Sequence, residues 1–199
     1  MKYLKLNKLL LLIFIINISC NKNKTEISEK FKTSYKTNDK IVGEFDRNKY
    51  SLIDEGITLR ESGEFKKAIE KFNLAEIEYG EMIQIYINRG VAYNQNDETE
   101  KSINEFTKCL KIDRNNFTAL LNRSLALAKK KDFENSIKDF DLLIELYKNK
   151  PEIYINRSVM YFLKKEIKLG CDDLRMAKKL DKNYNYEEEI TKLSIENCH

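Results

Sequence analysis

The sequence contains no Trp, one Pro, six Gly and one His among its 199 residues. So few Gly and Pro residues argue against an all-β protein, which needs many tight turns. The single imidazole belongs to His199, which argues against histidine-based catalysis and against a His-rich metal site. The sequence also lacks a Gly-rich phosphate loop, a Ser/His/Asp set and metal-ligand spacing. We therefore expect a helical protein that is not an enzyme and that carries no cofactor and no metal.

The charges of the chain are nearly balanced. It has 36 Lys and Arg residues against 32 Asp and Glu residues, a net charge of +4. Three of the Lys residues lie in the first eight positions, so the rest of the chain carries 33 basic and 32 acidic residues. This balance gives no electrostatic basis for binding nucleic acid.

The N-terminal segment, residues 1–20, is predicted to be a targeting segment. Three Lys residues precede an unbroken apolar run at residues 9–16, which is too short for a membrane span of about 20 residues. Ser19 followed by Cys20 resembles the lipobox of bacterial lipoproteins. The resemblance implies that Cys20 is lipidated and anchors the chain to a membrane of the bacterial cell envelope. Asn21, rather than Asp, favours the outer membrane over the inner one. The alternatives are an ordinary signal peptide cleaved nearby and an uncleaved anchor.

Residues 21–48 are rich in Lys, Asn and Thr, with scattered single aromatic residues. They offer little apolar area to offset the entropy of ordering, so we expect a flexible tether. The alternative is that Phe31, Tyr35 and Phe45 dock on the folded part of the chain.

A repeat with a constant period occupies the rest of the chain. The units are residues 49–82, 83–116, 117–150 and 151–184, and we number the places in each unit from 1 to 34. Places 8 and 20 are always small, whereas places 11 and 24 are always large. This pattern predicts one pair of closely packed helices per unit. Because no unit can bury its apolar face alone, neighbouring units must stack.

The period and the small–large pattern resemble the tetratricopeptide repeat (TPR). The resemblance implies an all-α fold, a TPR solenoid of four helix-turn-helix repeats, with residues 185–199 as a C-terminal capping helix. It also implies a protein or peptide partner, because TPR proteins bind such partners on a concave face lined by the first helix of each unit.

Charged residues recur at places 7 and 23. Arg occupies place 7 in units two to four, with Glu or Asp at place 23, whereas unit one has Glu55 and Lys71 with the signs reversed. The coordinated reversal predicts an ion pair within each unit, joining its two helices. The other possibility is a functional basic stripe made by the three Arg residues.

Place 6 carries an Asn ladder, which is our candidate peptide-binding surface. An amide offers both a donor and an acceptor and can pair with a peptide backbone whatever its side chains. Apolar residues flank the ladder at places 5 and 9. The candidate contacts are Asn88, Asn122, Asn156, Ile87, Val91, Leu121, Leu125, Ile155 and Val159. The alternatives are that the Asn residues bond to a neighbouring helix and that the apolar stripe is ordinary helix packing.

Three cysteines fall in the repeat region and the cap. Cys109 lies at a place that is usually small and buried, so we expect an inert thiol. Cys171 and Cys198 lie at similar distances from the turn that precedes the capping helix. In an oxidising compartment they would form a disulfide that fixes the cap. A zinc site at His199 lacks a fourth ligand.

The sequence thus predicts a lipid-anchored TPR adaptor that holds a protein or peptide partner at a bacterial envelope membrane. A second hypothesis is a structural, self-associating envelope component, and therefore a homo-oligomer. An enzyme is the third and least supported hypothesis.

Overall fold

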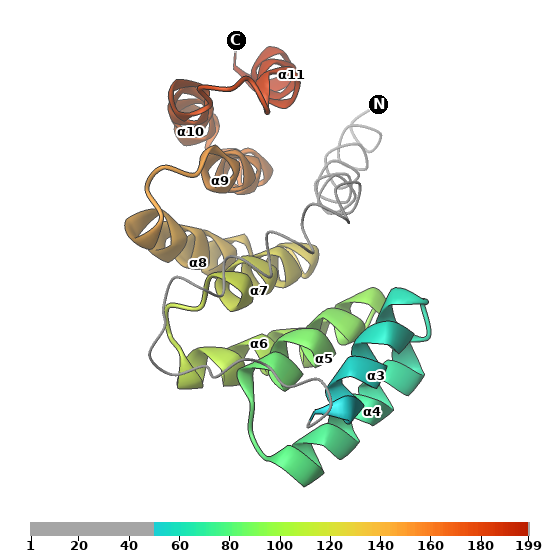
Figure 1. Ribbon diagram of the computed structural model, residues 1–199. Helices are drawn as coiled ribbons and strands as arrows, with labels where there is room; N and C mark the ends of the chain where they lie inside the picture. The colour runs from blue at the N-terminus through green and yellow to red at the C-terminus, as the bar shows by residue number, and fades with distance from the viewer. Residues whose placement is uncertain (1–49, 199) are drawn as a thin grey trace. The chain divides into compact units, whose positions relative to one another are not determined.

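The computed structural model describes residues 50–198, which fold into nine α-helices without a strand (Figure 1). The predicted signal peptide, Cys20 and the tether lie outside the described residues. The helices are α3 (Ser51–Glu61), α4 (Phe65–Tyr79), α5 (Ile83–Gln95), α6 (Thr99–Ile112), α7 (Phe117–Lys129), α8 (Phe133–Leu146), α9 (Pro151–Leu163), α10 (Ile167–Leu180) and α11 (Glu187–Asn197). The helices α3 to α10 form four antiparallel pairs, one for each repeat unit, and α11 follows as the cap. The predicted all-α fold is confirmed.

Small residues let the two helices of each unit approach closely. A Cβ atom on Gly56 would lie 2.6 Å from Cε1 of Phe72, and one on Gly90 would lie 2.7 Å from Cε1 of Phe106. These pairs join place 8 to place 24 across the unit. In unit four, Gly170 at place 20 leaves equivalent room for Phe162. The aromatic rings therefore fill the space that the missing side chains leave.

The turn between the two helices has the same backbone form in every unit. Place 15 adopts a positive φ each time, at Gly63, Asp97, Lys131 and Lys165. The N–H of the next residue donates to the carbonyl of place 11, at 2.9 Å in all four units. This is the Schellman pattern that ends a helix. Only unit one uses glycine for a conformation that costs other residues free energy.

Units stack through contacts of each second helix with the first helix of the following unit. α4 packs on α5, α6 on α7, and α8 on α9, while α11 packs on α10 in the same way. Neighbouring first helices also touch, since α3 contacts α5 and α5 contacts α7.

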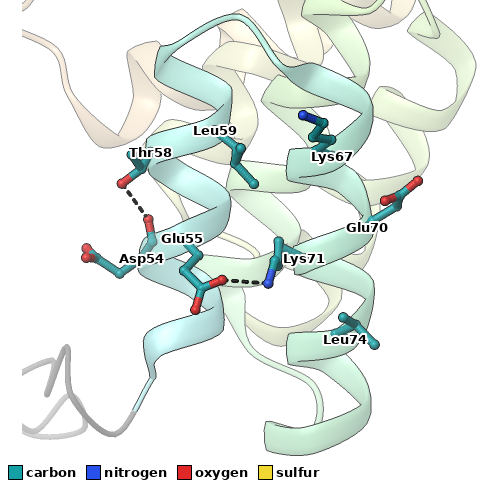
Figure 2. Close-up of a pocket in the computed structure, with 8 residues that line it drawn as sticks. All are labelled: Asp54, Glu55, Thr58, Leu59, Lys67, Glu70, Lys71 and Leu74. Carbon is teal, nitrogen blue, oxygen red and sulfur yellow. Dashed lines mark hydrogen bonds and ion pairs between the residues drawn. The ribbon is translucent and has the colours of Figure 1, made fainter.

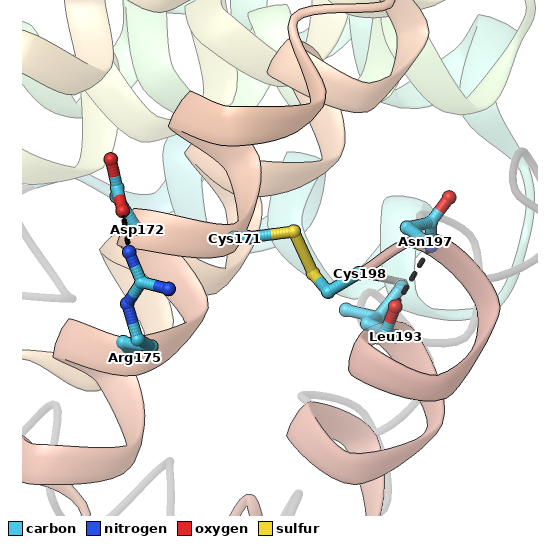
Figure 3. Close-up of a disulfide and its surroundings, with 6 residues drawn as sticks. All are labelled: Cys171, Asp172, Arg175, Leu193, Asn197 and Cys198. Carbon is cyan, nitrogen blue, oxygen red and sulfur yellow. Dashed lines mark hydrogen bonds and ion pairs between the residues drawn. A yellow bond between two sulfur atoms is a disulfide. The ribbon is translucent and has the colours of Figure 1, made fainter.

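The cap is held by a covalent bond and by one carboxylate. A disulfide joins Cys171 of α10 to Cys198 at the end of α11, with a Cα–Cα distance of 5.8 Å (Figure 3). This is the pairing expected from the sequence. In the turn between the helices, Asp181 accepts hydrogen bonds from the backbone N–H groups of Asn185 and Tyr186. The cap is therefore fixed to unit four at both ends of α11.

Candidate functional site

The arginines at place 7 connect helices within and between units. Arg123 donates to both carboxylate oxygens of Asp139 at 2.8 and 2.7 Å, and Arg157 binds Asp173 in the same way. Arg89 donates to Glu105 at 2.7 Å. In unit one the reversed pair, Lys71 with Glu55, is 2.6 Å apart (Figure 2). The predicted ion pairs within the units are confirmed.

Each of these arginines also reaches back to the preceding unit. Its Nη1 donates to place 25 of the preceding second helix, at Asn73, Thr107 and Asp141 respectively. Arg89 additionally pairs with Glu76 of α4 at 2.6 Å. The bonds to place 25 were missed from the sequence. The sequence spacing could have predicted them. Place 25 of one unit lies 16 residues before place 7 of the next, and place 23 lies 16 residues after place 7.

Burial and the neighbouring carboxylates make Arg89 part of the core, whereas Arg123 and Arg157 are half-buried. The Arg89 side chain is 3% exposed. Burial alone would lower the pKa of Arg89, but Glu76 and Glu105 outweigh it and raise the pKa. Burial likewise works to raise the pKa of Glu76, but the Arg89 hydrogen bond and charge bring it below the usual value. The guanidinium groups thus bond to neighbouring helices of the same chain. This argues against the alternative of a functional basic stripe made by the three Arg residues.

The Asn residues at place 6 share one hydrogen bond geometry. The amide nitrogens of Asn88, Asn122 and Asn156 each donate to the backbone carbonyl four residues earlier in their own helix, all at 2.8 Å. Among the described residues none of the three bonds to a neighbouring helix. The bond fixes the amide plane and leaves one N–H and the carbonyl oxygen free of hydrogen bonds within residues 50–198.

The exposure of the ladder changes along the chain. Asn88 and Asn122 are half-buried, as are the flanking Ile87, Val91, Leu121 and Leu125. In unit four the equivalents Asn156, Ile155 and Val159 are buried. We call the partly exposed surface made by the first six of these residues on α5 and α7 the ladder face. Ile87 and Val91 also pack against the buried cluster around Tyr86 and Phe106, so packing and exposure coexist there.

The remaining candidate features are the Cys109 thiol, a metal site and a membrane-spanning helix. Cys109 is buried, and burial, with a smaller contribution from Asp113, raises the pKa of its thiol to about 12. Within residues 50–198 no group of three or more His, Cys, Asp or Glu side chains could hold a metal ion. In the same part of the chain, no helix combines the length and apolar character of a membrane span.

Comparison with known families decides what this stack of helix pairs is. The family model of the tetratricopeptide repeat matches residues 83–116 and 117–150, which are units two and three. The fold is a TPR solenoid. A search of curated protein sequences finds no match.

Solved structures with the same fold include two bacterial proteins. MamA (41-end) from Desulfovibrio magneticus RS-1 superposes with a TM-score of 0.65 at 14% identity, covering 73% of this chain and 82% of that one. A tetratricopeptide repeat protein from Parabacteroides merdae ATCC 43184 gives a TM-score of 0.66 at 17% identity, covering 95% of this chain and 72% of that one. At such low identity these likenesses establish the TPR fold alone.

Proposed function

We propose that this protein is a TPR adaptor that binds an extended segment of a protein partner along the ladder face. TPR folds are typical of proteins that mediate protein–protein interaction. The backbone of an extended partner segment would bond to the free amide groups of Asn88 and Asn122. Its apolar side chains would pack beside Ile87, Val91, Leu121 and Leu125.

The observation that carries the proposal is the fixed, half-exposed amide at the same place of two stacked units. A pre-oriented group loses little entropy when it binds. Each hydrogen bond to a partner would contribute about 0.5–1.5 kcal/mol net. The arginines nearby are already bonded to carboxylates, so the binding surface is amide and apolar rather than charged. It does not favour an acidic tail as the ligand.

We further propose that lipidation of Cys20 anchors this adaptor to a membrane of a bacterial cell envelope, more specifically the outer membrane. The support comes from the signal-like sequence of residues 1–20 alone. Mass spectrometry of the native protein tests it directly, because a lipidated mature N-terminus at Cys20 is expected, and cleavage elsewhere would refute the anchor.

A pull-down from solubilised envelope tests the binding surface. The wild-type protein is compared with Asn88→Ala/Asn122→Ala and with a control, Asn104→Ala, which removes an exposed Asn of α6. Circular dichroism first confirms that all three are folded. Loss of two bonds predicts weakening by about 1–3 kcal/mol, or roughly 5- to 150-fold, for the double variant only.

Two results would refute the proposal. A partner retained equally by all three proteins would place binding elsewhere on the molecule. Capture of nothing but further copies of the chain, with a size that rises with concentration, would favour the self-associating component.

A further inference from the structure

The first repeat unit carries a groove between α3 and α4 (Figure 2). Its volume is about 520 Å³. It is lined by places 6, 7, 10 and 11 of the first helix and places 19, 22, 23 and 26 of the second: Asp54, Glu55, Thr58, Leu59, Lys67, Glu70, Lys71 and Leu74.

The first-helix wall of this groove is covered in the other three units. Place 10, at the centre of its first-helix wall, is 0% exposed at Ala92, Ala126 and Met160, whereas Thr58 is exposed. The covering element in each case is the second helix of the preceding unit, namely α4, α6 or α8. The hydrogen bonds from place 7 to place 25 show this contact directly. The first-helix wall of unit one thus occupies the places that contact an α-helix in the other units.

Unit one differs from the others in the sign of its charge. Place 7 is Glu55 rather than Arg, and Lys71 at place 23 is its partner within the unit. Elsewhere a basic place 7 bonds at once to its own place 23 and to a polar or acidic group on the incoming helix. With the signs reversed, a basic group on the incoming helix would complement Glu55. The lining carries three carboxylates, at Asp54, Glu55 and Glu70, against the two amines of Lys67 and Lys71. Leu59 and the half-exposed Leu74 offer apolar contacts.

We propose that this groove binds an amphipathic α-helix of a protein partner, with an apolar stripe toward Leu59 and Leu74 and a Lys or Arg residue toward Glu55. The site is separate from the ladder face and does not depend on the function proposed for it. The partner helix would extend the solenoid by continuing its stacking rule.

A pair of peptides that differ at one position provides the test. Both copy residues 64–80, because α4 already covers the equivalent first-helix wall of unit two, and both carry Glu76→Gln and a helix-stabilising staple on the outer face. One peptide carries Asn73→Arg and the other Asn73→Glu. Fluorescence anisotropy measures binding to the full chain. We expect the Arg peptide to bind at least about tenfold more tightly, because like charges facing each other are strongly unfavourable.

Protein variants then locate the site. Glu55→Arg/Lys71→Glu restores the charges of the other units and is expected to reverse the preference between the two peptides. Glu78→Arg reverses a charge of α4 at an exposed position outside the groove, and it should leave the preference unchanged. A preference that survives the double substitution, or no binding by any protein, overturns the proposal.

Two further outcomes would also overturn it. If the Arg peptide binds only after Phe31, Tyr35 and Phe45 are all changed to Asp, the chain's own N-terminal residues fill the groove. If the chain elutes at a larger size with rising concentration, and Glu55→Arg/Lys71→Glu abolishes this change, a second copy fills it.

Discussion

Removing the charge of Arg89 should destabilise the protein far more than removing the basic member of the ion pair in unit one. Arg89→Met keeps the stem packed but deletes the charge between Glu105 and Glu76. The Glu105 side chain is 6% exposed and the Glu76 side chain 29%. Breaking a buried pair from one side costs about 3–5 kcal/mol. Because Lys108 still contacts Glu105 at 2.9 Å, we expect the lower end, about 3 kcal/mol.

The matched substitution is Lys71→Met in unit one. This ion pair is open to water, with side-chain exposures of 35% for Lys71 and 51% for Glu55, so its loss should cost no more than about 1 kcal/mol. Urea unfolding followed by circular dichroism measures both. For a chain of this size, 3 kcal/mol corresponds to a fall in Tm of about 6–12 °C.

Acidification separates this mechanism from a general packing defect. In the wild type the pKa of Glu76 is lowered, so its stabilising contribution is present above the ordinary Glu pKa and is lost as the pH falls through the lowered value. In Arg89→Met, Glu76 has lost the guanidinium group that lowers its pKa, so lowering the pH costs the variant less of this contribution. The stability difference between the two proteins should therefore shrink toward pH 4. Equal losses for Arg89→Met and Lys71→Met, or a gap independent of pH, would refute the reasoning.

Three further predictions concern individual groups: the cap disulfide, two buried Ser hydroxyls and a residue with positive φ. Reducing the Cys171–Cys198 disulfide, which closes a loop with a sequence separation of 27, should lower stability by about 3.5 kcal/mol, and hydrogen exchange should rise first in α11; unchanged exchange there would contradict a pinned cap. Ser102→Ala should stabilise the protein by about 1 kcal/mol, because this buried hydroxyl has no hydrogen bond partner in the described chain. Ser124→Ala should instead destabilise it, because it removes a 2.7 Å hydrogen bond to a backbone carbonyl. Urea unfolding measures both, and a loss of stability in Ser102→Ala would contradict the prediction. Lys131→Gly should raise the Tm, because Lys131 has a φ of 66° that costs a non-glycine residue about 1–2 kcal/mol. A lower Tm would contradict this prediction and would mean that the greater freedom of glycine in the unfolded chain outweighs the relief of strain.

The fold was predictable because the repeat leaves several independent marks in one register. Places 8 and 20 are small and places 11 and 24 are large in every unit, and both charges of the ion pair change sign together in unit one. Such regularities specify which helices pair and at what depth. The cap disulfide followed from chain lengths on either side of a turn, since helices advance by a constant rise per residue.

The finer features depend on contacts that the period does not reveal. Arg89 at place 7 bonds to two helices at once, to α6 in its own unit and to α4 in the preceding unit. The ion-pair pattern predicted only the contact within the unit, because it compares places of the same unit. The Asn ladder binds its own helix, a local alternative that any Asn in a helix possesses. Burial of Asn156 and its neighbours also breaks the equivalence of the units, although the sequence repeats. The groove between α3 and α4 could be identified only by comparing its first-helix wall with the same places in the later units, where place 10 is buried.

Site-specific photocrosslinking in the native host tests the adaptor proposal most directly. A photoreactive residue replaces Val91 or Leu125 on the ladder face, and Asn104 or Asn135 on the exposed surfaces of α6 and α8 as controls. We predict that both ladder-face positions capture the same partner protein and that neither control does. Crosslinks from the control positions alone, or only between copies of this chain, would contradict the proposed binding surface.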